Sequence, residues 1–224
     1  MKTLQKTILA LSFAFTTTYT FAQTAYEKAM MPKVQTIEMP KPNPDDYTAQ
    51  ANDFARIGDK EKTLWQPYYY AAFSILKKGR TLMQQNQIAQ LDEVAKEAQN
   101  YIDKAEALSP NNAEIYILKK MNHGLKMMVN PMERWQTEGQ AAQNALNEAK
   151  KLDPENPRIT IMEAEDLYFT PEQFGGSKSK GIELFKKALE QFKTYKIKSS
   201  LDPNWDKVKR IILLLKRNSF ISIL

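Results

Sequence analysis

The sequence contains no cysteine and only one histidine among its 224 residues. Without cysteine the chain forms no disulfide, offers no thiolate nucleophile and cannot build a zinc site of the usual Cys/His kind. A Ser–His–Asp triad would have to use His123, and its place in the middle of a predicted helix favours a partly packed surface residue. We therefore expect no such catalysis and no bound metal, with stability supplied by core packing.

An excess of charge of one sign is also missing from the body of the chain. The formal net charge is +6. Lys2 and Lys6 contribute two of these charges, and residues 206–224 hold five basic residues against Asp206. Residues 23–205 are therefore neutral overall, which is typical of a solvated helical surface rather than a phosphate-binding one. We expect no nucleic-acid partner.

No stretch alternates apolar and polar residues with the period of a strand. Helical periodicity instead predicts helices over residues 47–57, 62–84, 87–108, 112–129, 132–152, 158–169 and 178–193. Paired acids such as Glu163 and Glu165 do not converge on one helix face. We therefore expect a protein that is not an enzyme. The alternative is an enzyme whose catalytic groups are only acids, hydroxyls and lysines.

One long sequence segment occurs twice in the chain. Residues 98–115, AQNYIDKAEALSPNNAEI, recur 44 positions later as residues 142–159, AQNALNEAKKLDPENPRI. Small, large and small residues at spacings of four and three form one helix face, and Pro110 or Pro154 then ends the helix. A weaker third copy begins at Gly181. A unit that repeats its helix, its stop and its next start indicates a repeat protein.

This pattern resembles the second helix and turn of a tetratricopeptide repeat (TPR), a unit of ~34 residues. The longer spacing implies about ten inserted residues near positions 129–136. The resemblance covers residues 47–205 and implies an all-α, TPR-like α-solenoid of stacked antiparallel helix pairs, with about three degenerate repeats. Residues 23–46 are expected to form a short helix and a Pro-rich linker.

The first 22 residues have the features of a secretory signal peptide. Two lysines precede an apolar stretch over residues 7–21, and Ala22 supplies a small residue before the predicted cleavage point. A membrane anchor is the alternative, but the apolar stretch falls short of the ~20 residues that a span needs. We expect an exported protein, periplasmic or secreted, with cleavage after Ala22.

Three further segments sharpen the resemblance: residues 65–72 (WQPYYYAA), 169–178 (FTPEQFGGSK) and 202–205 (DPNW). Together with the signal peptide they resemble small exported TPR proteins common in Bacteroidota. That resemblance implies a scaffold or interaction role, without catalytic residues or cofactors.

Residues 206–224, DKVKRIILLLKRNSFISIL, depart from the pattern because a closing helix should have a polar outer face. We consider two origins for this segment. One is a frameshift; the other is a natural basic and apolar tail that lies on a membrane surface or on a partner. Membrane contact is expected only through this tail.

Stacked TPR-like first helices line a concave groove. Repeat positions and the aromatic run at 65–70 select the partner-binding candidates: Trp65, Tyr68, Tyr69, Ile117, Met121, Leu125, Ile161, Glu165 and Tyr168. Consecutive helical residues point about 100° apart, so at least one aromatic of the run should face solvent or the groove. Packing in the core is the alternative for all of these residues.

The sequence thus predicts a non-enzymatic scaffold that binds an unidentified protein or peptide in the periplasm or cell envelope. The alternative is a small-molecule or lipid-binding adaptor of an envelope transport system. That alternative predicts a closed apolar pocket in the region of Tyr68, Met121 and Tyr168.

Overall fold

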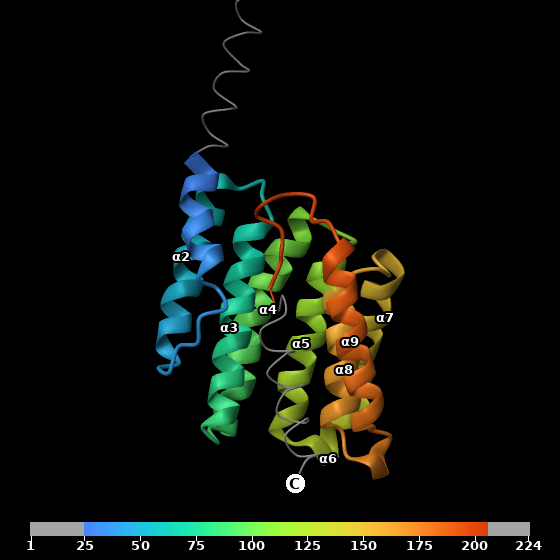
Figure 1. The fold of residues 1–224 in the computed structure, drawn as a ribbon. Coiled ribbons are helices and arrows are strands. Elements are labelled where there is room, and N and C mark those ends of the chain that lie inside the picture. Colours follow the sequence, from blue (N-terminus) through green and yellow to red (C-terminus); the bar gives the residue numbers. More distant parts are fainter. Residues whose placement is uncertain (1–24, 206–224) are drawn as a thin grey trace, which may run out of the picture.

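The computed structural model describes residues 25–205, and every regular element in that stretch is helical. After helical residues 25–35 come the main helices α2 (Asp45–Glu61), α3 (Gln66–Gln84), α4 (Leu91–Leu108), α5 (Ala113–Val129), α7 (Gln140–Leu152), α8 (Pro157–Phe169) and α9 (Lys178–Thr194). Successive helices pack antiparallel in one stack (Figure 1). The prediction of an all-α fold of stacked helix pairs is confirmed.

The signal peptide and the atypical tail lie outside the described residues and stay predictions. None of the helices in residues 25–205 is both long enough and apolar enough to span a bilayer.

The repeated sequence produces a repeated helix start. Asn112 caps α5 by accepting a hydrogen bond from the Glu114 backbone N–H at 3.0 Å, and Asn156 caps α8 by accepting one from the Arg158 N–H at 3.0 Å. These side chains satisfy backbone donors that a helix leaves unpaired at its first turn. Because the two caps are 44 residues apart, α5 and α8 begin in the same register.

The inserted residues between α5 and α7 do not form an open turn. They fold as the short helix α6 (Pro131–Arg134), which is followed by one π-helical turn, η2 (Trp135–Gly139). The predicted continuous helix over 132–152 is therefore interrupted. Arg134 holds α6 against α4 by donating from Nη1 to Asp92 Oδ1 at 2.6 Å. The inserted residues thus form a short helical connection between α5 and α7, and these two helices still pack against each other.

The last described residues return across the stack. After α9, residues 195–205 leave the helix, pass over its end and run back toward α3, drawn in orange-red in Figure 1. Tyr70 Oη donates to the Leu201 carbonyl at 3.1 Å, and Gln66 Nε2 donates to Asp202 Oδ1 at 3.1 Å. The end of the described chain therefore packs on one of its first helices.

Helix α3 lies at the centre of the core. It packs against α2, α4 and α5, and residues 195–205 contact its remaining side. Tyr68, Tyr69 and Tyr70 are consequently all buried, and Trp65 alone of the aromatic run keeps partial exposure. Of the four aromatic residues, only Trp65 could therefore face solvent or a groove, because neighbouring elements cover the part of α3 that carries the tyrosines.

Candidate functional site

Helices α3, α5 and α8 run parallel and share one face of the stack, which we call the inner face: the side on which residues 195–205 lie (Figure 1). On α5 this face carries a stripe at spacings of three and four residues, consisting of Glu114, Ile117, Met121, Gly124 and Met128. On either side of it, α3 presents Tyr69, Phe73 and Arg80, and α8 presents Arg158 and Glu165. The inner face has an amino-terminal half and a carboxyl-terminal half, named for the helix ends they adjoin.

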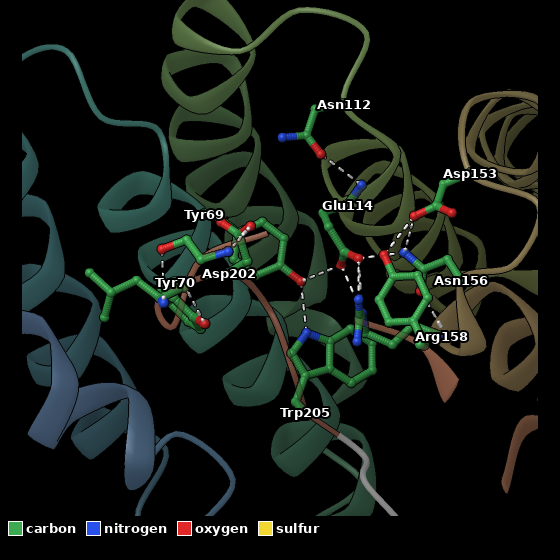
Figure 2. Close-up of polar contacts among 12 residues, drawn as sticks. Tyr69, Tyr70, Asn112, Glu114, Asp153, Asn156, Arg158, Asp202 and Trp205 are labelled. Atoms are coloured by element: carbon green, nitrogen blue, oxygen red, sulfur yellow. Dashed lines mark hydrogen bonds and ion pairs between the residues drawn. The ribbon is translucent and has the colours of Figure 1, made fainter. Parts of the chain in front are cut away.

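The amino-terminal half is built around a buried ion pair. Arg158 donates from Nε to both carboxylate oxygens of Glu114 at 3.0 Å and from Nη2 to Oε1 at 2.5 Å (Figure 2). Only 1% of the Arg158 side chain and 9% of the Glu114 side chain are exposed. Asn156 Nδ2 adds a hydrogen bond to Glu114 Oε1 at 2.5 Å. The helix caps described above place these residues, because Glu114 and Arg158 follow their capping asparagines by two positions.

The returning segment covers this ion pair with aromatic rings. The Arg158 guanidinium lies 5.4 Å from the Tyr195 ring centroid and 6.0 Å from that of Trp205. Trp205 stacks on Phe73 with ring centroids 4.8 Å apart. Its Nε1 donates to Tyr69 Oη at 2.7 Å (Figure 2). Residues 195–205 thereby close the amino-terminal half of the inner face.

The electrostatics of this half favour a fixed charge pair. Burial disfavours the charged guanidinium, but the Glu114 carboxylate more than offsets it, so the pKa of Arg158 is raised above its ordinary value. Burial, together with the charge of Glu114, raises the pKa of Tyr69 well above its usual range. A permanently charged arginine and a permanently neutral phenol cannot exchange protons near neutral pH. This cluster is suited to holding the fold together.

The carboxyl-terminal half is different. Met121, Gly124 and Met128 are each partly exposed. A Cβ placed on Gly124 would meet no atom of the described residues within 4 Å. A Cβ on Gly58, by contrast, would lie 2.8 Å from the Tyr68 ring. The space beside Gly124 is therefore open among the described residues, and packing within them does not require a glycine at this position of α5.

One ion pair crosses the carboxyl-terminal half. Arg80 of α3 donates from Nη2 to Glu165 Oε1 of α8 at 3.3 Å, and 39% of the Arg80 side chain and 15% of the Glu165 side chain are exposed. Lys120 of α5 lies nearby and pairs with Asp166 at 2.6 Å. Burial raises the pKa of Glu165 above its ordinary value, although Arg80 and Lys120 both oppose this rise.

The sequence-predicted residues are divided among several places. Met121, Glu165 and Tyr168 lie on α5 and α8 and are partly exposed, whereas Ile117 and Ile161 are buried. Leu125 is buried against α3, where its Cδ1 is 2.5 Å from the position of a Cβ on Gly79. As partner-contacting residues, these side chains and Trp65 and Tyr69 stay predictions.

Tyr68 belongs to another surface of the stack. Its hydroxyl donates to Asp59 Oδ1 of α2 at 2.7 Å, and the Lys104 ammonium of α4 lies 5.0 Å from its ring centroid. Burial, followed by the hydrogen bond to Asp59, raises its pKa to about 12. The small-molecule alternative predicts one closed apolar pocket near Tyr68, Met121 and Tyr168. Tyr68 lies on a different side of the stack from the other two residues, so it cannot line a pocket with them.

His123 lies beside the inner face and not on it. Its Nδ1 is 2.6 Å from Glu138 Oε2 in the π turn, and both side chains are about one-quarter exposed. No group of three or more His, Cys, Asp or Glu side chains in residues 25–205 is arranged to hold a metal ion. The lone histidine is thus a partly packed surface residue with a carboxylate partner.

Large apolar side chains are exposed at the end of the stack that adjoins the carboxyl-terminal half. Met132 of α6 and Trp135 of η2 follow α5, while Phe169 ends α8 and Phe174 lies in the turn η3 (Glu172–Phe174). These turns lie at the same end of the stack (Figure 1). Exposed apolar side chains therefore lie at the end of the stack that follows Met121 and Met128.

Two surface depressions elsewhere are polar. One, of about 570 Å³, is lined by Glu97, Asn100, Tyr101, Asp103 and Lys104; the other, of about 330 Å³, is lined by Lys33, Thr36, Lys41, Asp46, Ala49, Gln50 and Asp53. Their charged and amide linings do not suit an apolar ligand. We therefore take the carboxyl-terminal half of the inner face as the candidate site.

No family model matches the chain, and no curated protein matches it. The TPR resemblance therefore stays a prediction. Among solved structures, the HusA haemophore from Porphyromonas gingivalis is similar, with 30% sequence identity and a TM-score of 0.73. The similarity covers 87% of this chain and 94% of that one. The chain described here belongs to the same family as HusA.

Proposed function

We propose that this protein is a non-enzymatic carrier that binds haem on the carboxyl-terminal half of its inner face. The similarity to a protein named as a haemophore supports a small-molecule ligand over the peptide that the sequence first suggested. The observation that locates the proposed site is the open space beside Gly124.

A glycine in the middle of a helix needs a reason. It costs roughly 0.5–1 kcal/mol relative to alanine, and it is favoured where a backbone approaches a ligand closely. At Gly124, no described neighbour occupies the space of a Cβ. A flat macrocycle laid along α5 can use this space to contact the helix backbone directly.

The neighbours of Gly124 suit such a ligand. Met121 and Met128 lie on the same stripe, separated along α5 by about 10 Å at 1.5 Å per residue. Their thioethers are flexible and polarisable, so they adapt to a large apolar surface. Methionine and tyrosine both occur as ligands of haem iron in proteins, and Tyr168 of α8 occupies the position 44 residues after Gly124. The site therefore offers apolar contact along the ring and candidate ligands for the metal.

The direct test is a titration of the purified full chain with haemin, followed through the Soret absorption band. A Gly124→Leu variant fills the gap, so we expect at least a tenfold loss of affinity without loss of thermal stability. The matched control is Lys186→Leu, which adds the same side chain at an exposed position of α9. Unchanged haemin affinity in Gly124→Leu would refute this site.

Iron-free protoporphyrin separates burial of the ring from ligation of the metal. We expect Gly124→Leu to weaken both haemin and protoporphyrin, since it removes contact area. Met121→Leu and Met128→Leu keep apolar volume, so either one should weaken only haemin if its sulfur binds iron. Protoporphyrin affinity is measured by quenching of tryptophan fluorescence.

A further inference from the structure

We infer that Arg80 is the carboxylate-recognising residue of the inner face and gives it a preference for a tetrapyrrole with free carboxylates over an esterified one. This inference rests on the proposed function, since it concerns the ligand of the same site. Arg80 would bind the carboxylate substituents at the edge of that ligand.

Arg80 has hydrogen-bonding capacity that its present contact does not use. A guanidinium has five N–H donors and binds carboxylates best through two parallel hydrogen bonds. Among the described residues, Arg80 makes one hydrogen bond, from Nη2 to Glu165 at 3.3 Å, which is long for a charge-assisted bond. With 39% of its side chain exposed, Arg80 can reach a carboxylate from solvent.

The position of this guanidinium matches the candidate site. Arg80 starts on α3 and reaches Glu165 on α8, so its side chain extends toward the far side of the inner face, with α5 lying between the two helices (Figure 1). A macrocycle that lies over Gly124 would therefore bring an acidic substituent toward Arg80. The apolar ring would then contact α5 beside Gly124, and the carboxylate at its edge would contact Arg80.

The other cations of the inner face are committed elsewhere. Arg158 is buried, binds Glu114 through two nitrogens and is covered by Trp205. Lys120 is 12% exposed and pairs with Asp166 at 2.6 Å. Arg80 is thus the cation with the looser contact and the greater access.

Glu165 is the competitor for Arg80. An incoming carboxylate must share or take the guanidinium from it, and two carboxylates close together repel each other. Burial also raises the pKa of Glu165, so this carboxylate holds its charge less firmly than an exposed one does. Removing the charge by Glu165→Gln should therefore strengthen binding of an acidic ligand, whereas Arg80→Gln should weaken it.

The test compares haemin with its dimethyl ester in one detergent-containing buffer, using the full chain. We expect the wild type to bind the diacid at least tenfold more tightly than the diester. Arg80→Gln should reduce this ratio to about one by weakening the diacid alone, Arg80→Lys should keep part of it, and Glu165→Gln should increase it.

The outcomes separate the inference from the function on which it rests. If the wild type binds neither ligand, the proposed function fails and the inference fails with it. If the wild type binds both ligands equally, the function stands and the role of Arg80 is refuted. If Arg80→Gln weakens diacid and diester to the same extent, Arg80 is structural and the inference is also refuted.

Discussion

The two halves of the inner face are built from the same three helices, yet they have different chemistry. In the amino-terminal half, equivalent positions 44 residues apart hold Glu114 and Arg158, which pair directly and are covered by Trp205. In the carboxyl-terminal half, equivalent positions hold Gly124 and Tyr168, and the space beside Gly124 is open among the described residues. A repeat therefore supplies geometry to both halves, while a few substitutions decide which half stabilises the fold and which is available to a ligand.

The largest expected effect comes from breaking the buried pair of the amino-terminal half. Arg158→Met leaves the Glu114 carboxylate buried without its main partner, which should lower the free energy of unfolding by about 3–5 kcal/mol. The measurement is equilibrium unfolding in urea. Adding Glu114→Leu to the same chain should recover most of the loss, because a buried pair is often replaceable by apolar residues. If Arg158→Met alone is as stable as the wild type, the ion pair contributes little to the free energy of unfolding.

The cover over that pair should be nearly as important. Trp205 is buried and stacks on Phe73, so Trp205→Ala should cost about 3–5 kcal/mol by the same measurement. Trp135→Ala is the matched control, since that ring is 52% exposed and its loss should change stability by less than about 0.5 kcal/mol. Equal effects of the two substitutions would mean that residues 195–205 do not seal the fold.

A smaller effect of opposite sign is expected in the carboxyl-terminal half. Gly124→Ala places a methyl group in open space and removes a flexible residue from a helix, so stability should rise by about 0.5–1 kcal/mol. Gly58→Ala should instead destabilise, because its Cβ would lie 2.8 Å from the buried Tyr68 ring. A destabilised Gly124→Ala variant would show that the gap serves the fold after all.

The smallest expected effect is a difference in pH dependence. The folded state raises the pKa of Glu165, so it keeps this proton to higher pH than the unfolded state does. Within that window the unfolded state binds fewer protons, and the contribution of Glu165 to stability falls as pH rises. Unfolding free energies measured between about pH 4 and pH 7 should therefore fall more steeply with pH for wild type than for Glu165→Gln. Parallel profiles would contradict this.

Much of the helix pattern is local and could be predicted from the sequence. The predicted helix over 158–169 is observed as Pro157–Phe169, because Asn156 caps it and Pro157 suits its first position. The predicted helix over 178–193 is observed as Lys178–Thr194, where Ser177 caps the start. The π turn over Trp135–Gly139 was missed, since the sequence there continues a helical pattern.

The inner face was predicted less completely. Repeat register places Met121, Glu165 and Tyr168 on α5 and α8 with partial exposure, but it also selected Leu125, which packs against α3, in place of Gly124. The opposite charges of Glu114 and Arg158 at equivalent repeat positions were a signal for their pairing that went unused. No sequence pattern connects Tyr69 to Trp205, because their hydrogen bond joins residues 136 positions apart.

The return of residues 195–205 to α3 has a consequence for how this chain could gain a further helix pair. Open solenoids lengthen by duplicating a helix pair, because each repeat contacts only its neighbours. Here the chain after α9 must still reach Gln66, Tyr69 and Tyr70, and one more pair would move α9 too far away for the same short segment. An added helix pair would therefore need a longer segment in place of residues 195–205, whereas substitutions within the existing helices leave these contacts intact.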